Sequence, residues 1–321
     1  MSDMKPVSLR QYADALGKNN YRIFPAGPER FWVQYEALGY VRVPTFDLDP
    51  VLAKQVTGML WQGWGAVASF ILPPDKHHEP NAWLFICRDA HYNLEKLSKN
   101  ARRDARRAER YLQIEPLEWK TLFDYGLTAY SDTRIRVGLT DGTPDRFKKR
   151  FGAFSKNPAH HVLGAWKDDK LAAFMTLVTV DDWVEIEGCF STNEHRGFCP
   201  NDGLGNYVLE HFLAQQKARI VSYGLSSVQE GSGHDGLHAY KTKVGFEAIP
   251  VHRAFVFHPF VRPFVNRLTY RGVRLIQSLL PGVRRINKLG GILANAFQRE
   301  HLEFAPCKAT QSASEQKQLL P

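Results

Sequence analysis

The spacing of apolar residues predicts a chain that mixes helices and strands. Apolar runs at 66–72 and 82–87 are typical of strands, with Pro73 and Pro74 marking the break between them. Residues 93–111 carry leucines and alanines at intervals of three and four, which predicts a helix. Residues 31–40 are predicted to form a further helix with aromatic and aliphatic side chains on one face.

The second half of the chain has a defined order of predicted elements. Helices are expected at 118–130 and 143–154, strands at 161–166, 171–180 and 184–190, a helix at 205–218, a strand at 219–225, a short helix at 237–244 and a strand at 246–257. This order indicates an α/β mixture rather than a doubly wound repeat. The sequence shows no repeat of fixed period.

Residues 260–280 are predicted to form an amphipathic helix. One side carries Phe264, Val265, Leu268, Gly272, Leu275, Ile276, Leu279 and Leu280, and the other carries Arg262, Arg267, Arg271 and Arg274. Pro281 and Gly282 end this helix, and a second basic segment follows at 283–297. The Gln- and Ser-rich residues 308–321 are expected to be disordered.

Charge is concentrated in the same C-terminal region. The chain of 321 residues has a net charge of +9, and residues 251–300 hold nine lysines and arginines against Glu300, a net +8. Such asymmetry indicates an anionic partner. An anionic membrane surface is favoured for residues 260–299, with packing onto the core and RNA binding as the alternatives.

Other features limit the class of protein. At 44% hydrophobic residues the chain can bury a sizeable core. It lacks an apolar run of about 20 residues and an N-terminal signal core, so a cytoplasmic protein is expected, peripheral at the inner membrane face if the C-terminal segment binds lipid. The cysteines match no zinc spacing, and we expect no metal. Cys199 is the one thiol placed as a candidate nucleophile.

A glycine-bearing stretch follows the strand that ends near Phe190. Arg196 precedes Asn201-Asp202-Gly203-Leu204-Gly205-Asn206, and a helical pattern comes next. A glycine turn between a strand and a helix can hold a pyrophosphate on its backbone N–H groups. An ordinary loop is the alternative, since glycine is common at such junctions.

The order of elements around Pro200-Asn201-Asp202-Gly203-Leu204-Gly205 resembles the GNAT acyltransferase superfamily. The resemblance implies that this turn binds the pyrophosphate of coenzyme A. The family's leading Arg or Gln is replaced by Pro200, and Arg196 is a candidate substitute. The family's tyrosine acid, four residues before a Gly-Phe pair, is replaced by Lys241, with Tyr240 one residue away.

These departures resemble the FemAB-like branch of GNAT-fold proteins, found in envelope and exopolysaccharide pathways. The motifs are the arginine-rich stretch 97–108, the pair Pro200-Asn201, and Tyr240-Lys241-Thr242-Lys243-Val244-Gly245. The resemblance covers roughly residues 90–257. It implies an acyl-CoA donor or, as in peptidoglycan-bridge enzymes, an aminoacyl-tRNA.

Several side chains are candidates for the chemistry. Glu185 and Glu187 alternate on one strand, so they should share a face where either could act as general base. Lys241 is expected to contact donor phosphate or the developing oxyanion. Substrate-binding candidates are Arg102 and Arg106, which lie one helical turn apart, together with Arg134, Arg136 and His234. For each of these groups, a solvated surface position is the alternative.

Together these observations predict an α/β (α+β) GNAT fold with a central mixed, twisted sheet. The expected layout is a divergent GNAT-like half at 1–115, a catalytic GNAT domain at 116–258, a basic helical extension at 259–304 and a disordered tail at 305–321. The expected function is transfer of an acyl group, acetyl above all, from acyl-CoA to a small-molecule or a lipid- or saccharide-linked amine or hydroxyl. Aminoacyl-tRNA as donor and a non-catalytic membrane-associated scaffold are the alternatives.

Overall fold

The structure is a computed structural model that describes residues 4–35, 38–139, 142–226, 235–280 and 283–297. The chain divides into two compact units. Unit 1 comprises Met1–Asn19, Ile86–Gly224 and Tyr240–Glu247, and unit 2 comprises Asn20–Phe85, Leu225–Ala239 and Ala248–Pro321, in each case as far as the structure describes them. Each unit therefore draws on separate parts of the sequence, whereas the predicted layout was sequential.

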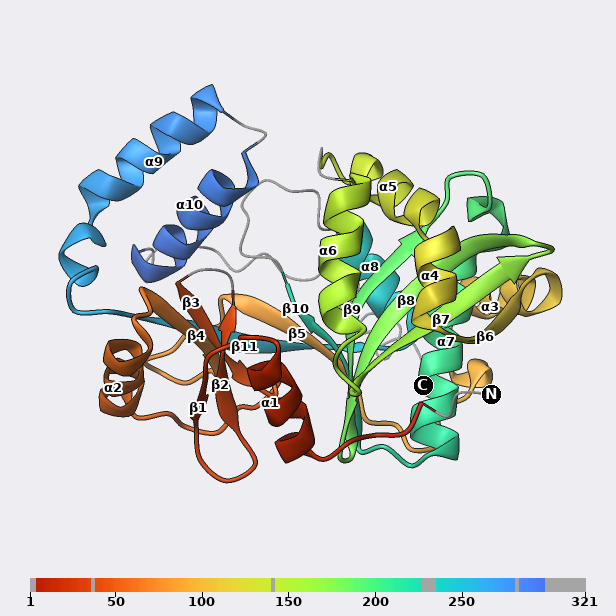
Figure 1. Ribbon diagram of the computed structural model, residues 1–321, viewed down its shortest axis with the longest axis horizontal. Helices are drawn as coiled ribbons and strands as arrows, with labels where there is room; N and C mark the ends of the chain where they lie inside the picture. Colours follow the sequence, from red (N-terminus) through yellow and green to blue (C-terminus); the bar gives the residue numbers. More distant parts are fainter. Residues whose placement is uncertain (1–3, 36–37, 140–141, 227–234, 281–282, 298–321) are drawn as a thin grey trace, which may run out of the picture. The chain divides into compact units, whose positions relative to one another are not determined.

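Unit 1 is built on a sheet with the strand order β6-β7-β8-β9-β10 (Figure 1). Its strands are β6 (Gln113–Leu117), β7 (His160–Lys167), β8 (Lys170–Val180), β9 (Trp183–Ser191) and β10 (Ile220–Leu225). Its helices are α1 (Leu9–Lys18), α3 (Lys99–Tyr111), α4 (Trp119–Tyr125), α5 (Leu127–Arg136), α6 (Pro144–Phe154), α7 (Pro200–Leu209) and the later part of α8 (Asp235–Val244). Short 3-10 turns lie at Leu94–Lys96 and Arg196–Phe198, and a π-helical segment, Glu210–Gln215, continues α7.

Helices cover both faces of this sheet. Figure 1 shows α4, α5 and α6 on one face and α7 on the other. On the first face, rings from α6 and the strands pack together, with Phe151 5.5 Å from Phe174 and 5.8 Å from Phe190 between centroids. The central strand β8 is buried at every residue after Lys170. A strand covered on both faces is largely apolar, and after Lys170 the polar residues of β8 are the buried Thr176 and Thr179.

Unit 2 contains strands in the order β1-β2-β3-β4-β11-β5, apart from the last two residues of β5 and the first of β11, which belong to unit 1. Its strands are β1 (Ile23–Pro25), β2 (Phe31–Tyr35), β3 (Gly39–Val43), β4 (Val67–Leu72), β5 (Ala82–Cys87) and β11 (Glu247–Phe257). Its helices are α2 (Ala53–Gly63), α9 (Arg267–Leu279) and α10 (Arg284–Phe297), with a 3-10 turn at Arg262–Phe264. β3 and β4 are parallel, and β4 and β11 are antiparallel.

Most predicted elements are confirmed, and several are corrected. The helix expected at 31–40 is wrong, because β2 and β3 pair as an antiparallel hairpin there. Its run of aromatic and β-branched residues suits a strand. The single helix expected at 118–130 is divided at Gly126, where α4 ends and α5 begins. The sequence reading also missed β6 between α3 and α4.

Among the described residues, no helix combines the length and the apolar character needed to cross a membrane. In the same part of the chain, no group of three or more His, Cys, Asp and Glu side chains is placed to hold a metal ion.

Candidate active site

A β-bulge interrupts β9 in the sheet of unit 1. β8 pairs Thr176 with Gly188 but Leu177 with Ile186, so Glu187 is the extra residue of β9. The parallel pairing of β9 with β10 covers only 183–185 against 220–222 and ends just before the bulge. A bulge bends its strand and locally increases its twist. Beyond Glu185 and Ser222, the described residues of β9 and β10 therefore no longer pair with each other.

The two candidate carboxylates lie where this pairing ends. Glu185 is half-buried, and its Oε1 lies 4.0 Å from the position that a Cβ on Gly224 of β10 would take. Glu187 is exposed, yet desolvation by the surrounding protein raises the pKa of its carboxyl, against an opposing effect of Arg150. The regular alternation expected for this pair is interrupted, because Glu187 itself is the bulged residue. A carboxyl group that is accessible to water and has a raised pKa is suited to act as a general base.

Lys241 on α8 is a buried cation beside the same part of the sheet. Only 3% of the residue is exposed, and burial lowers the pKa of its ammonium to about 7. Its Nζ donates to the carbonyl of Tyr223 at 2.9 Å and lies 4.7 Å from the Tyr223 ring centroid. Tyr223 follows the last residue of β10 that pairs with β9. The ammonium therefore lies where the two strands no longer pair.

Tyr240 has a structural partner in unit 1. Its hydroxyl donates to the carbonyl of Asn201 at 2.7 Å, which joins α8 to the start of α7. Burial holds the pKa of Tyr240 well above its usual range, and the Tyr223 phenol adds to that shift. The Tyr240 hydroxyl is therefore engaged in holding α8 against the start of α7.

The predicted glycine turn is instead part of helix α7, which begins at Pro200. The N–H groups of Asp202 and Gly203 both donate to the carbonyl of Cys199, and Pro200 has no N–H. A Cβ on Gly203 would lie 2.5 Å from Cβ of Ala108, and one on Gly205 would lie 2.7 Å from Cγ1 of Val244. The glycines therefore permit close packing against α3 and α8. Their role as a pyrophosphate cradle stays a prediction.

The neighbours of these glycines are also held inside unit 1. Leu204 is fully buried. The amide of Asn206 makes two hydrogen bonds. Its Oδ1 accepts from the Tyr92 hydroxyl at 3.1 Å, and its Nδ2 donates to Oε1 of Glu109 at 3.1 Å. Asn201 Oδ1 is buried without a hydrogen-bond partner among the described residues. Binding of a cofactor by Leu204, Asn206 or Asn201 remains untested.

Two arginines lie near the start of α7. Arg196 is exposed. The pKa of Arg136 is lowered mainly because Arg136 is partly buried, and secondly because the positive charge of Arg196 is near it. Arg136 donates to Asn193 Oδ1 at 2.7 Å and to Ser191 Oγ at 3.0 Å, at the end of β9. Two like charges held near one another favour an anionic ligand. Arg134 is instead buried over the ring of Tyr130, and His234 lies outside the described residues.

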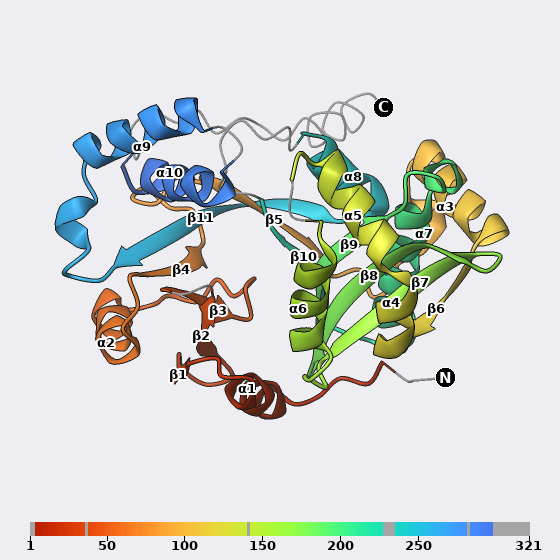
Figure 2. The ribbon, with the colours of Figure 1, turned by 45° about the horizontal axis from the view of Figure 1, so that its top comes forward.

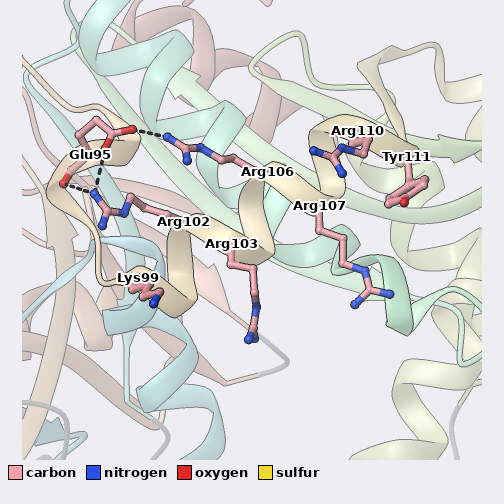
Figure 3. A pocket seen from close by; sticks show the side chains of 8 residues that line it. All are labelled: Glu95, Lys99, Arg102, Arg103, Arg106, Arg107, Arg110 and Tyr111. Atoms are coloured by element: carbon pink, nitrogen blue, oxygen red, sulfur yellow. Dashed lines mark hydrogen bonds and ion pairs between the residues drawn. The ribbon is translucent and has the colours of Figure 1, made fainter.

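An arginine-lined groove runs along α3 (Figure 3). Its volume is about 690 Å³, and it is lined by Glu95, Lys99, Arg102, Arg103, Arg106, Arg107, Arg110 and Tyr111. Glu95 accepts from Arg102 at 2.8 Å and also pairs with Arg106. Figure 3 shows Arg103 and Arg107 pointing away from Glu95. Arg102 and Arg106, predicted as substrate ligands, thus share one carboxylate within a strongly cationic groove.

Lys243 is an important residue that the sequence reading passed over. Its Nζ lies 2.8 Å from Oδ2 of Asp104 on α3 and also pairs with Asp202 in the first turn of α7. This ion pair network ties α8 to both helices. The available signal was the spacing Lys241-x-Lys243 on one short helix, which presents one lysine to β10 and the other to α3.

Comparisons with known proteins identify the fold. No family model matches the chain, and no curated protein matches it. FemX is similar in structure, with a TM-score of 0.52 at 11% identity over 79% of this chain and 92% of that one. The C-terminal DUF2156 domain of a putative lysylphosphatidylglycerol synthetase from Agrobacterium fabrum has a TM-score of 0.50 at 15% identity, over 86% and 98%. The chain therefore has a GNAT-like fold of the FemX kind, as the resemblance predicted.

Proposed function

We propose that this protein transfers an activated acyl group to an amine or a hydroxyl. The observation that carries the proposal is the bulge at Glu187, where β9 no longer pairs with β10 and a buried lysine lies beside β10. A base on β9 and a cation beside β10 would meet the needs of acyl transfer, which must remove a proton from the nucleophile and stabilise negative charge on the carbonyl oxygen.

The proposed reaction is a direct displacement. Glu187 takes the proton of the acceptor, and the freed lone pair attacks the acyl carbon. The bond from that carbon to the donor's sulfur or oxygen then breaks. Lys241, whose pKa of about 7 lets it exchange a proton near neutrality, stabilises the oxyanion or protonates the leaving group. Glu185 is the second candidate base, since it lies at the last paired position of β9.

Acyl-CoA is the donor we favour, with its phosphates held by side chains. The N–H groups of Asp202 and Gly203 already donate to the carbonyl of Cys199. Fewer backbone N–H groups at the start of α7 are therefore available to bind a phosphate. Arg196 and Arg136 supply cationic donors close to the same point. Arginine binds phosphate through paired N–H groups and keeps its charge when partly buried. The acceptor we expect is a small-molecule or a lipid- or saccharide-linked amine or hydroxyl.

Aminoacyl-tRNA is a second candidate donor, and the groove on α3 favours it. Five arginines and Lys99 line one continuous surface there, with Glu95 as the acid among the lining residues. Such a surface can follow a nucleic-acid backbone, whose binding weakens steeply with salt. Acyl-CoA has fewer phosphates and would need only part of this groove.

A surrogate acceptor tests the function before the natural acceptor is known. The full-length protein is mixed with hydroxylamine and either acetyl-CoA or an aminoacyl-tRNA, and the acyl hydroxamate is measured by mass spectrometry. Enzyme-dependent hydroxamate from one donor supports transfer and identifies the donor class. No hydroxamate from a panel of acyl-CoAs and charged tRNAs, with no binding of any of them by calorimetry or gel shift, contradicts the proposal and favours a non-catalytic scaffold.

Binding by a groove variant separates the two donors. Arg106→Glu should weaken binding of charged tRNA by about tenfold or more and leave acetyl-CoA affinity within about twofold, because it reverses one charge of the α3 groove. Lys120→Glu makes the same charge change at an exposed position on α4 and serves as the control. Equal loss of tRNA binding in both variants would mean that the groove has no special role.

A further inference from the structure

Within the described part of unit 2, helix α9 leaves its apolar side uncovered. α10 packs along one side of α9 (Figures 1 and 2), where Val273 is buried and Gln277 donates to the carbonyl of Ile286 at 3.5 Å. On a different side, Leu268, Leu275 and Leu279 are exposed by 79%, 64% and 71%. At 100° per residue these leucines fall within a narrow arc of the helix. The apolar side predicted from sequence is thus not the side that α10 covers.

Arginines border this row of leucines. Arg267, Arg271 and Arg274 are all exposed and recur every three or four residues, so they form a second row beside the leucines. α9 has no acidic residue that could neutralise them. A row of leucines flanked by a row of arginines is the arrangement of a helix that lies in the plane of a membrane interface.

The apolar surface continues before α9. Phe260 and Phe264 are exposed by 70% and 68%. The ring of Phe260 lies 5.0 Å from that of Trp61 on α2, which holds it in place while most of it stays exposed. Segments that lie in a membrane interface carry Trp, Phe or Leu on the side that faces the acyl chains. The described surface at 260–279 therefore combines leucines, phenylalanines and arginines.

We propose that α9 and the Phe260–Phe264 turn before it bind the surface of an anionic lipid bilayer. The leucines and phenylalanines would enter the boundary between headgroups and acyl chains, and the arginines would contact lipid phosphates. At 13 residues and about 1.5 Å per residue, α9 would lie along the surface rather than across it. RNA would use the arginines alone, so the adjacent leucines favour lipid. This inference is independent of the proposed transfer reaction.

Vesicle binding of the full-length protein tests the proposal. Sedimentation with phosphatidylglycerol–phosphatidylcholine vesicles should show binding that falls by at least about tenfold on pure phosphatidylcholine, because each basic residue near an anionic surface contributes roughly fivefold to partitioning. Arg271→Glu and Arg274→Glu should each weaken binding to the anionic vesicles by about fivefold or more. Lys54→Glu changes the charge of an exposed position on α2 and should have a much smaller effect.

Leucine variants separate lipid insertion from attraction by charge. Leu275→Ser with Leu279→Ser should reduce binding by at least about tenfold, since each leucine that leaves water contributes appreciably, whereas Leu52→Ser at another exposed leucine should not. Circular dichroism checks that each variant is folded. The proposal is overturned if folded wild-type protein ignores anionic vesicles, if the leucine pair has no effect, or if α9 variants instead abolish RNA binding or self-association at unchanged vesicle binding.

Discussion

Two arginine-rich helices of the same length, α3 and α9, treat their apolar sides in opposite ways. α3 buries Ala101, Ala105 and Ala108 to 3% exposure or less, and it packs closely on α7 at Gly203. α9 buries Val273 but exposes Leu268, Leu275 and Leu279. The small alanines of α3 allow a neighbouring helix to approach, while the large leucines of α9 have no described neighbour of unit 2 that covers them.

The comparison also concerns charge. Glu95, in the turn before α3, pairs with two arginines of α3, and Asp104 of α3 pairs with Arg103 and Lys243. Part of the charge of α3 is therefore neutralised inside unit 1. α9 has no acid of its own. We infer that α3 is a core helix whose outer surface binds a ligand, and that α9 is a peripheral helix whose partner is an extended surface.

The largest expected difference between the helices follows from a buried charge. Ala105→Glu on α3 should lower the free energy of unfolding by about 3–5 kcal/mol, because it places an unpaired carboxylate in a site that is 2% exposed. Leu275→Glu on α9 should change it by no more than about 0.5 kcal/mol, since that side chain is exposed. Chemical denaturation of both variants measures this, and equal losses would contradict the distinction between the two helices.

Lys241 extends the comparison to a cation that is buried inside unit 1, with 3% of the residue exposed. Its pKa is about 7 in the folded protein and higher when unfolded, so the unfolded state binds more protons between these values. The wild-type free energy of unfolding should therefore gain up to about 1.4 kcal/mol per pH unit above pH 7 from this site, and the penalty of burying the charge is fully present below it.

Lys241→Met removes that dependence. Urea denaturation at several pH values from 6 to 9 should show wild type gaining stability relative to this variant as the pH rises. The exposed Lys148→Met on α6 provides the control. A wild-type and Lys241→Met difference that stays constant with pH would mean that the ammonium is not held in a desolvated site.

Gly203 tests how closely α3 must approach α7. Gly203→Ala should cost about 1–2 kcal/mol, because the new Cβ meets Ala108 Cβ at 2.5 Å and Ile114 Cδ1 at 2.9 Å, and overpacking outweighs the helical advantage of alanine. Gly197→Ala, which has no atom within 4 Å of the new Cβ, should be nearly neutral. If Gly203→Ala is neutral in thermal unfolding but abolishes coenzyme A binding, the glycine is a ligand-binding position rather than a packing one.

The smallest effect is expected at Glu95. Its carboxylate is exposed, so Glu95→Gln should change stability by less than about 1 kcal/mol even though it pairs with two arginines. Removal of the negative charge should strengthen binding of a polyanion to the α3 groove by about two- to fivefold. Titration with charged tRNA at low salt measures this. Weaker binding would indicate that Glu95 positions the arginines for the ligand.

Much of the fold could be predicted from the sequence, because periodicity records which side of an element is buried. The alanine spacing of α3, the Thr143–Pro144 start of α6 and the apolar run of β8 all gave the correct element. The helix prediction for residues 31–40 was wrong because a short run of aromatic and aliphatic residues fits both the helical period of 3.6 and the strand period of 2. These residues form strands, since β2 pairs with β1 and β3 pairs with β4.

The site was harder to predict because it depends on register. No local signal marks Glu187 as a bulge, since the extra residue appears only when β9 pairs with β8. The glycines at 203 and 205 fit a phosphate turn and a close helix contact equally well from sequence, and the structure places them in α7. Lys241 was singled out from the sequence by its position, but its burial against Tyr223 needed the fold.

Hydroxamate formation by Glu187→Gln measures whether this carboxylate is the general base. We expect kcat/KM to fall by about 10²-fold or more with unchanged donor affinity, and we expect full activity in Glu118→Gln, an exposed carboxylate at the start of α4. Wild-type activity in folded Glu187→Gln, with the same dependence on pH, would contradict a general base at the bulge of β9.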